Sequence, residues 1–461
     1  MNLSVREILE ATQGELLQGQ GTEWVQSIST DSRTIQKGEY FLCLIGENFD
    51  GHQFVAEVIA KGAGGLILDE KHKSDSFPNK IIPIIAVKDT SHALGNIARA
   101  WRRKFDIPLL AVGGSNGKTS TKDMCAAVFA SQFKTLATEG NLNNLIGVPK
   151  MLFKLDKKYE AAVIEMGMNE FGEMARLTEI TEPTLALLTN TGFEHVEKMK
   201  SLEGVAQSNG EMFAKLPSGA LALVNADDEY IPKMPTRAYK ISFGMEKPAD
   251  VFCEKFDLKE EGIYLEVSFR GKAYPFEVPV HGKANVRNAL AAIAAGFAMG
   301  IDPKKIKQGL ASYRGRSMRM EVLNLKQGVQ ILNDCYNANP SSMMAALETL
   351  LSLKKNNSAL AILGEMRELG DFAEEGHRLV GEAVAKNKIN RLISIGPFAS
   401  QMVEVALAQG MDANFCKAFS KQEDALETIL SWLPECKSIL IKGSRGAKME
   451  KITEFLKEKL N

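Results

Sequence analysis

A glycine-rich stretch from residue 111 to residue 121 constrains the fold of this chain more than any other segment. It reads AVGGSNGKTST and lies between a short apolar run, residues 107–110, and residues 122–129, whose apolar spacing is typical of a helix. A strand, a glycine turn and a helix in this order form a phosphate cradle, because glycine lets backbone N–H groups approach phosphate oxygens and the helix N-terminus attracts negative charge. The alternative is an ordinary glycine-rich turn between a strand and a helix.

Two side chains of this stretch have predicted roles in a nucleoside triphosphate site. The Lys118 ammonium would reach the β- and γ-phosphates, and the Thr119 hydroxyl would bind Mg²⁺. Val112 stands where the eight-residue form of the motif has glycine, so the match is to the shorter form Gly-x-x-Gly-Lys-Thr-Ser. The loop residues predicted to bind the nucleotide are Gly114, Ser115, Asn116, Gly117, Lys118, Thr119 and Ser120.

Length and composition indicate a globular protein of several domains. A chain of 461 residues is long for one core, and 45% hydrophobic with 25% charged residues is an ordinary globular composition. A net charge of −1 gives no field that would favour nucleic acid or an anionic membrane. We expect a cytoplasmic protein without membrane insertion, because the N-terminus has no apolar leader and no apolar run approaches about 20 residues.

The six cysteines are scattered and lack the spacing of metal ligands. Several lie in apolar runs, which predicts buried free thiols in a reducing compartment. They are Cys43, Cys125, Cys253, Cys335, Cys416 and Cys436.

Changes of pattern divide the chain into three expected domains, residues 1–105, 106–314 and 315–461. The middle domain contains the phosphate cradle and, at residues 250–280, an alternating β-type stretch. Strand and helix patterns alternate in the last third, which predicts a parallel, doubly wound sheet. In such a sheet the ligand crevice lies beyond the carboxyl ends of the strands.

The N-terminal third contains a polar group near predicted strand ends. Hydroxyls, an arginine and turn residues could hold a phosphate-bearing ligand there, and ordinary turn chemistry explains the same residues equally well. The candidates are Ser29, Thr30, Asp31, Ser32, Arg33, Gly46, Asp50 and His52.

Two residues after later strands are candidate metal ligands. Glu165 lies in an apolar strand, residues 161–168, and an enzyme with such a phosphate cradle needs a carboxylate at a strand end to hold Mg²⁺. His195 follows the next strand and could complete the metal sphere, although its position alone favours a surface or structural histidine. The loop between the cradle helix and Glu165 could position a substrate or cap a helix, through Asn141, Asn143 and Asn144.

Asparagines and other polar residues mark two further positions. Asn285 and Asn288 lie three apart on the first turn of an alanine-rich helix, where they could read a purine edge or cap the helix. Residues after strand ends in the last third would line the crevice, namely Asp334, Tyr336, Asn337, Asn339, Arg367 and 442–445.

These motifs together resemble the Mur ligases of bacterial peptidoglycan synthesis over nearly the whole chain. The N-terminal polar group is similar to the family's UDP-binding domain, and residues 114–120 match its phosphate loop. The most specific motifs are DCYNANP at 334–340, LGEMRELG at 363–370 and KGSR at 442–445, which are similar to the branch that adds D-alanyl-D-alanine. The Asp-Asn-Pro-Arg motif of the diaminopimelate-adding branch is absent from the sequence.

The resemblance implies an ATP-dependent amide ligase that joins D-alanyl-D-alanine to UDP-N-acetylmuramoyl-tripeptide through an acyl phosphate. The implied fold is a UDP-substrate-binding α/β domain, a central ATPase domain with a mostly parallel sheet, and a Rossmann-like, doubly wound C-terminal domain. The implied cofactors are ATP and Mg²⁺, the partners are the two substrates, and the enzyme is expected to be a monomer.

The resemblance also implies residue roles. Lys118 and His195 would act in catalysis, and Thr119, Glu165 and His195 would hold Mg²⁺. Adenine, ribose and phosphates would be contacted by Asn285, Asn288, Asp334 and Arg319. The substrates would be contacted by the N-terminal polar group and by Asn141, Asn143, Asn144, Tyr336, Asn337 and Asn339.

Three positions depart from the family pattern. Leu145 stands where the family usually has an acid, and Ala284 where it often has histidine. Asn209 stands where the family has a lysine that becomes carbamylated and supplies an anionic ligand for a second metal. An amide is neutral and cannot be carbamylated, so we hypothesise a working site with an altered metal dependence.

Two alternatives remain from the sequence. A folylpolyglutamate synthase-like ligase would share the core, but the N-terminal domain argues against it. A nucleotide switch would need a guanine-reading Asn-Lys-x-Asp motif, and Ala226 occupies the lysine position.

Overall fold

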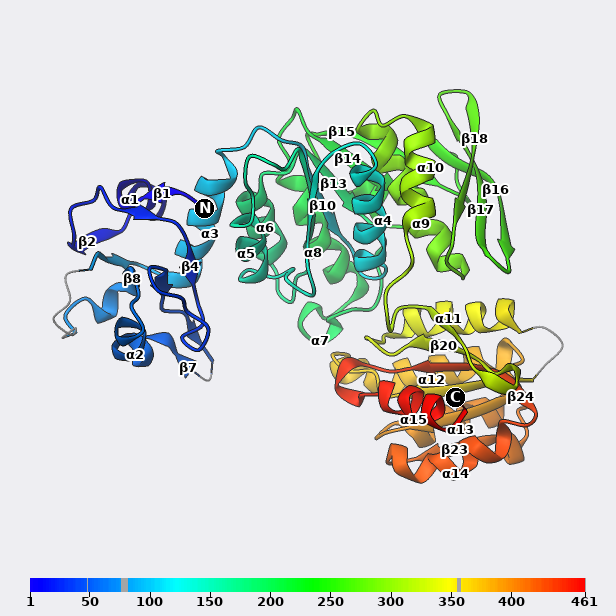
Figure 1. The fold of residues 1–461 in the computed structure, drawn as a ribbon. Coiled ribbons are helices and arrows are strands. Elements are labelled where there is room, and N and C mark those ends of the chain that lie inside the picture. The colour runs from blue at the N-terminus through cyan, green and yellow to red at the C-terminus, as the bar shows by residue number, and fades with distance from the viewer. Residues whose placement is uncertain (48, 76–81, 355–357, 461) are drawn as a thin grey trace.

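In the residues that it describes, the computed structural model has three large sheets that follow one another along the chain, each packed against helices (Figure 1). The structure describes residues 1–47, 49–75, 82–354 and 358–460. The predicted α/β class with three sheet-based units is confirmed, whereas the domain boundaries at 105 and 314 stay a prediction. In the part of the chain that the structure describes, no helix is long and apolar enough to cross a membrane.

The N-terminal sheet has the strand order β2-β9-β8-β5-β4, and only β2 runs antiparallel to its neighbour. Its strands are β2 (Glu15–Gln18), β4 (Ile28–Ser29), β5 (Tyr40–Leu42), β8 (Gly65–Asp69) and β9 (Ile84–Val87). Two small pairs accompany it, β1 (Leu3–Ser4) with β3 (Trp24–Val25) and β6 (Ile45–Gly46) with β7 (Phe49–Asp50). The helices are α1 (Val5–Thr12) and α2 (Val55–Ala60). A capping box between Ser4 and Glu7 begins α1.

The central sheet has nine strands in the order β11-β12-β10-β13-β14-β15-β16-β17-β18. All neighbours are parallel up to β16, and the last two pairs are antiparallel. The strands are β10 (Leu109–Gly113), β11 (Thr135–Ala137), β12 (Ala161–Glu165), β13 (Leu185–Leu188), β14 (Leu221–Asn225), β15 (Tyr239–Gly244), β16 (Val251–Lys259), β17 (Gly262–Phe269) and β18 (Lys272–Val278). The antiparallel end of the sheet covers the alternating stretch of the sequence.

Helices cover both faces of the parallel part of the central sheet, so β10, β12 and β13 are buried at every residue. Along β10, Leu110 and Val112 pack on the side of α4 and α9, while Leu109 and Ala111 pack on the opposite side. The helices are α3 (Thr90–Arg102), α4 (Lys118–Ala130), α5 (Gly147–Leu152), α6 (Glu173–Thr181), α7 (Val196–Met199), α8 (Leu202–Ala214), α9 (Lys283–Ala298) and α10 (Pro303–Ser312). The strand begins two residues later than the apolar run at 107–110, because Pro108 has no N–H to donate.

The C-terminal sheet has the order β19-β20-β24-β21-β22-β23 and is parallel except for the edge pair β19–β20. Its strands are β19 (Glu321–Asn324), β20 (Gln330–Asp334), β21 (Ser358–Gly364), β22 (Arg391–Ile395), β23 (Cys416–Phe419) and β24 (Cys436–Lys442). Its helices are α11 (Pro340–Leu353), α12 (Ala373–Lys386), α13 (Ala399–Ala408), α14 (Gln422–Trp432) and α15 (Glu450–Leu460). Separate apolar clusters fill its two faces, which confirms the doubly wound prediction.

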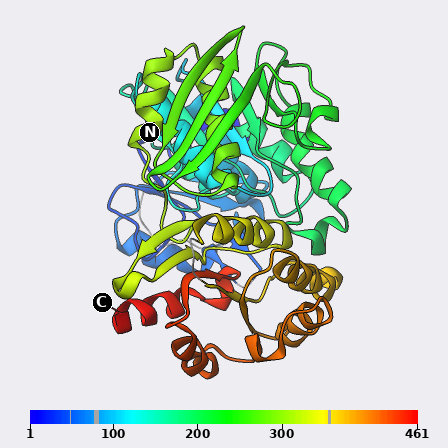
Figure 2. The ribbon, with the colours of Figure 1, turned by 90° about the vertical axis from the view of Figure 1, so that its right-hand side faces the viewer.

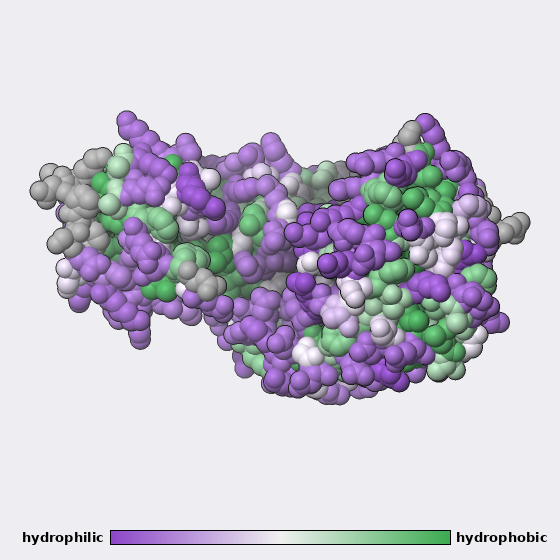
Figure 3. All heavy atoms as spheres, turned by 90° about the horizontal axis from the view of Figure 1, so that it is seen from below, coloured by the Kyte–Doolittle hydropathy of each residue, from purple (hydrophilic) through white to green (hydrophobic). Residues whose placement is uncertain are grey.

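The C-terminal unit lies below the central one, and α11 lies between the two sheets (Figures 1 and 2). Helix α11 contacts α9 of the central unit. Seen from below, hydrophilic residues cover most of the surface, with apolar residues interspersed (Figure 3). All six cysteines are buried and free, as predicted, and burial raises the pKa of the Cys335 thiol to about 12.

Candidate active site

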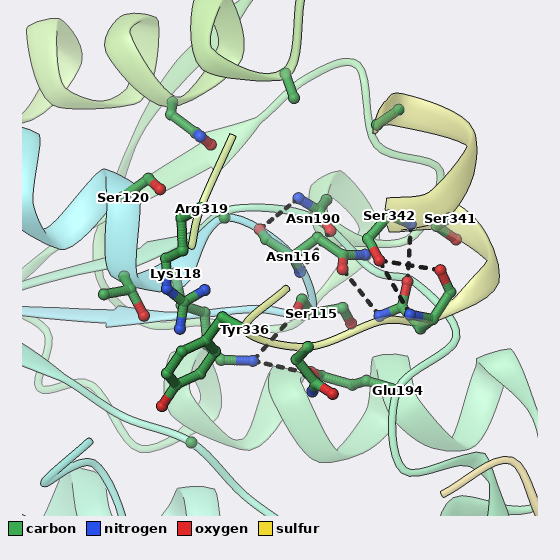
Figure 4. A pocket seen from close by; sticks show the side chains of 18 of the residues that line it. Ser115, Asn116, Lys118, Ser120, Asn190, Glu194, Arg319, Tyr336, Ser341 and Ser342 are labelled. Carbon is green, nitrogen blue, oxygen red and sulfur yellow. Dashed lines mark hydrogen bonds and ion pairs between the residues drawn. The ribbon is translucent and has the colours of Figure 1, made fainter. Parts of the chain in front are cut away.

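A cavity of about 690 Å³ lies between the central and C-terminal units (Figure 4). The carboxyl ends of three central strands meet at one edge of it, because Val112 of β10 pairs with Glu165 of β12 and Gly113 pairs with Leu188 of β13. The loops after these strands therefore face the loops that follow β20 and β24 of the C-terminal sheet. The predicted residues that line the cavity are 115–120, Asn141, Asn143, Asn144, Glu165, His195, Asn285, Asn288, Arg319, Asp334, Tyr336, Asn337, Asn339, Arg367 and Lys442.

The phosphate loop requires glycine at two positions. Gly114 has a φ of 111°, and a Cβ there would lie 2.4 Å from Thr189 Oγ1 and 2.8 Å from Thr189 N. Gly117 has a φ of 78°, and a Cβ there would lie 2.4 Å from Asn288 Oδ1. Helix α4 begins at Lys118 without a side-chain cap, so its first N–H groups are open to an anion.

Lys118 makes an ion pair that the sequence does not reveal. Its Nζ donates to Glu194 Oε2 at 2.7 Å and to the Ser115 carbonyl at 3.1 Å (Figure 4). Both charged side chains are largely buried, with 16% of Lys118 and 11% of Glu194 exposed. Glu194 comes from the loop after β13, next to His195, and only its place after a parallel strand could have drawn attention to it.

One carboxylate oxygen of Glu165 has no hydrogen-bond partner in the described part of the chain. Its Oε1 accepts hydrogen bonds from Thr119 Oγ1 at 3.1 Å and from Asn143 Nδ2 at 2.9 Å. Its Oε2 is buried and makes no hydrogen bond to any residue that the structure describes. A buried carboxylate oxygen without a partner is costly, and a hard divalent cation such as Mg²⁺ prefers carboxylate and hydroxyl oxygens. The side chains of Thr119 and Glu165 therefore fit a magnesium ion.

His195 lies in the same cavity but is turned toward the C-terminal unit. Its φ is 50°, and its Nδ1 lies 2.9 Å from Glu368 Oε2. This hydrogen bond from His195 lowers the pKa of the Glu368 carboxyl below its ordinary value. In this arrangement His195 joins the central and C-terminal units across the cavity.

Three other contacts join the two units near the phosphate loop. Asn339 Nδ2 donates to Asn116 Oδ1 at 2.9 Å, and the same Asn339 caps α11 through its Oδ1. The rings of Phe193 and Phe372 stack with centroids 4.9 Å apart. The Glu197 N–H donates to the Glu368 carbonyl at 3.4 Å. The C-terminal unit is thereby held directly over the phosphate loop.

The two candidate asparagines of α9 are part of a buried network. Asn288 Nδ2 donates to Asn285 Oδ1 at 3.0 Å, and Thr121 Oγ1 donates to Asn288 Oδ1 at 3.2 Å. Asn285 Nδ2 donates to the His281 carbonyl at 2.9 Å. This network ties α9 to α4 beside the phosphate loop, so both asparagines are fixed in place.

The C-terminal unit contributes three charged side chains. Asp334 and Lys442 are paired in register on β20 and β24, and Lys442 Nζ donates to Asp334 Oδ2 at 2.5 Å. The Arg319 guanidinium lies 3.9 Å from the centre of the Tyr336 ring, an attractive cation–π arrangement. Its Nε is buried and has no hydrogen-bond partner among the described residues. Arg319 lines the cavity near Lys118 (Figure 4).

The N-terminal polar group does not line this cavity, although the structure describes all eight of its residues. Arg33 Nη2 and Asp31 Oδ2 form an ion pair at 2.7 Å, and hydrogen bonds from Arg33 hold the pKa of the Asp31 carboxyl far below its ordinary value. These residues form a surface separate from the cavity. A single ligand that contacted both this surface and the cavity would have to be long and extended.

Asp50, His52 and His72 bring three potential metal ligands within 4.8 Å of one another. The hydrogen bonds account for this cluster without a metal. His52 Nε2 accepts the Asp69 N–H at 3.0 Å, so the ring carries its proton on Nδ1, which lies 2.6 Å from Asp50 Oδ1. A metal on Nδ1 would displace that proton. The neutral ring would then carry its proton on Nε2, which could no longer accept the Asp69 N–H.

Asn209 is 1% exposed, and neither its amide nitrogen nor its amide oxygen has a hydrogen-bond partner within the described chain. It lies on α8 and does not line the cavity. The hypothesis of an altered metal dependence stays a prediction.

Comparison with known families gives three matches in chain order. They are "Mur ligase family, catalytic domain" over residues 25–102, "Mur ligase middle domain" over residues 112–296, and "Mur ligase, glutamate ligase domain" over residues 318–445. A UDP-N-acetylmuramoyl-tripeptide–D-alanyl-D-alanine ligase of Bacillus subtilis (strain 168) is 33% identical over 456 residues, which cover 99% of this chain and 98% of that protein. The chain belongs to the Mur ligase family.

Solved Mur ligase structures share the whole arrangement. MurF from Acinetobacter baumannii has a TM-score of 0.91 and 31% identity, with 99% of each chain covered. MurF ligase from Thermotoga maritima, solved in complex with ADP, has a TM-score of 0.81 and 23% identity, with 94% of this chain and 97% of that chain covered. The family resemblance inferred from the motifs is confirmed over nearly the full length of this Mur ligase.

Proposed function

We propose that this Mur ligase uses ATP to join D-alanyl-D-alanine to UDP-N-acetylmuramoyl-tripeptide, which produces the pentapeptide precursor of peptidoglycan. The observation that carries the proposal is the shared cavity. It places the phosphate loop and Glu165 opposite Arg319 and the Asp334–Lys442 pair, so groups suited to a nucleotide and groups of the C-terminal unit enclose one space. The full-length similarity to ligases named for this reaction supports it.

The reaction has two steps. A carboxylate does not condense with an amine in water unaided, because the oxygen that must leave is a poor leaving group. A carboxylate oxygen of the tripeptide first attacks the γ-phosphorus of ATP, which breaks the bond to the β-phosphate oxygen and gives an acyl phosphate and ADP. The amine of D-alanyl-D-alanine then attacks the acyl carbon, and the tetrahedral intermediate collapses to the amide as phosphate leaves and the nitrogen loses a proton.

The chain's own residues mainly bind and orient the reactants. Lys118 donates to the oxygens of the transferred phosphoryl group, and the open N–H groups at the start of α4 hold the neighbouring phosphates. Arg319 supplies a second cation from the C-terminal unit, so charge neutralisation is complete only when the two units meet. Magnesium, held by Thr119 and Glu165 with His195 as the third predicted ligand, would neutralise further phosphate charge.

The other predicted contacts follow the same division. The adenosine would lie beside Asn285 and Asn288, with Asp334 toward the ribose. The N-terminal polar group would hold the UDP part of the long substrate, away from the cavity. Asn141, Asn143 and Asn144 of the central unit, with Tyr336, Asn337 and Asn339 of the C-terminal unit, would contact the peptide parts. We propose that one chain acts alone in the cytoplasm, where ATP is available.

A phosphate-release assay tests the function. The purified protein is given ATP, Mg²⁺ and UDP-N-acetylmuramoyl-tripeptide carrying either lysine or meso-diaminopimelate, with and without D-alanyl-D-alanine. We expect phosphate and a lengthened peptide only with the dipeptide and one of the tripeptides. Release with folate and glutamate instead would favour the folylpolyglutamate synthase-like alternative, and release that no acceptor stimulates would favour a nucleotide switch.

A further inference from the structure

The Lys118–Glu194 ion pair engages Lys118 Nζ, the atom that a nucleotide phosphate would need. Lys118 Nζ lies 2.7 Å from Glu194 Oε2, a charge-assisted hydrogen-bond distance, and its other partner is the Ser115 carbonyl. These two acceptors leave one N–H of the ammonium, so a phosphate oxygen that binds Lys118 would lie against the Glu194 carboxylate. Two anions cannot share the site without strong repulsion, because both side chains are largely shielded from water.

The loop that carries Glu194 is fixed without this ion pair. The Ser115 N–H donates to the Asn190 carbonyl at 2.8 Å, and the Gly192 N–H donates to Ser115 Oγ at 2.9 Å. Asn190 Oδ1 also accepts the Asn116 N–H at 3.0 Å. Because these bonds hold the loop against the phosphate loop, the carboxylate of Glu194 is not needed to shape the backbone.

The carboxylate has instead the charge and position of a phosphate oxygen. The open N-terminus of α4 and the Lys118 ammonium attract negative charge to this end of the cavity, and Glu194 is the acidic side chain that forms an ion pair with Lys118. We propose that Glu194 is an internal stand-in for the nucleotide's phosphate, and that ATP binds by displacing it from Lys118. The proposal rests on the proposed ATP site.

Displacement lowers the apparent affinity for nucleotide. If the free protein holds Lys118 in the ion pair about nine-tenths of the time, only the remaining tenth is ready to bind phosphate, and the dissociation constant is raised about tenfold. Removing the carboxylate would then tighten the binding of ATP and ADP about tenfold. AMP has no β- or γ-phosphate for Lys118, so its affinity should not change.

The test is calorimetric titration of the full-length protein with ATP, ADP and AMP. Four proteins are compared: the natural sequence, Glu194→Gln, Glu194→Asp and the control Glu197→Gln. The control removes the same charge from an exposed residue of the same segment. Glu194→Asp keeps the charge but is shorter by one methylene group, so it separates contact with Lys118 from a general effect of charge.

We expect Glu194→Gln and Glu194→Asp to bind ATP and ADP several-fold to tenfold more tightly than the natural protein, with AMP and the Glu197→Gln variant unchanged. The stand-in is refuted if Glu194→Gln binds ATP equally or more weakly, if Glu194→Asp behaves like the natural protein, or if Glu197→Gln shows the same gain. A natural protein that binds no ATP at all would instead refute the proposed function.

Discussion

Replacing Lys118 with alanine removes the one side chain that the phosphate loop directs into the cavity as a cation. The ammonium is only 16% exposed, so water screens its interaction with a phosphate weakly. Loss of one donor to a developing negative charge slows an enzyme by about 10²–10³-fold, and charged donors form the stronger hydrogen bonds. We therefore expect Lys118→Ala to lower kcat/KM for ligation at least about 10³-fold, or about 4 kcal/mol.

The same substitution also has a structural cost that must be separated from catalysis. It leaves Glu194, which is 11% exposed, without its cation, and an unsatisfied buried partner costs about 1–3 kcal/mol of stability. The double variant Lys118→Ala, Glu194→Gln removes that charge as well, so we expect its Tm to recover toward the natural value while ligation stays lost.

The assay is phosphate release with ATP, both substrates and each variant, together with binding of the UDP-linked tripeptide. Binding should stay measurable in Lys118→Ala, because the N-terminal polar group lies outside the cavity. Turnover within tenfold of the natural enzyme would contradict the phosphoryl-transfer role. Recovery of turnover in the double variant would show that the loss came from Glu194 and not from the missing ammonium.

Three further outcomes follow from the geometry. Gly114→Ala places a Cβ at a φ of 111° and 2.4 Å from a neighbouring atom, so we expect the free energy of unfolding in urea to fall by about 1–3 kcal/mol. The control Gly219→Ala has open space around it and should change little, and equal losses would contradict the prediction. Lys442→Met leaves the Asp334 carboxylate without its ion-pair partner and should lower the free energy of unfolding by about 3 kcal/mol. The added substitution Asp334→Asn should recover part of this loss, whereas an additive loss would argue against the ion pair. Burial lowers the pKa of His377 below its ordinary value of about 6.5, so below that pH the unfolded chain binds a proton that the native chain does not bind. The free energy of unfolding therefore falls as the pH drops below that value. His377→Gln should flatten this fall between about pH 7 and 5.5, and an unchanged slope would contradict the prediction.

The sequence by itself determined the features that depend on neighbours along the chain. The glycines at 114 and 117, followed by Lys118, require a turn that leads into a helix, and the structure has both at positive φ with α4 beginning at Lys118. The apolar runs and their alternation with helix patterns predicted a parallel, doubly wound sheet, and the acid of one run, Glu165, lies where parallel strands end together. These predictions succeed because backbone sterics and burial act over a few residues.

Only the tertiary structure decided which side chains meet. The ion pair of Lys118 with Glu194 joins residues 76 apart in sequence, and His195 meets Glu368 from the C-terminal sheet. No periodicity encodes such contacts, because they depend on how loops at the ends of separate sheets come together. The same reason places Ser29 to Arg33 outside the cavity although their chemistry resembles that of its lining. Local pattern thus set the elements and their order, while packing between the units set the charges that the cavity presents.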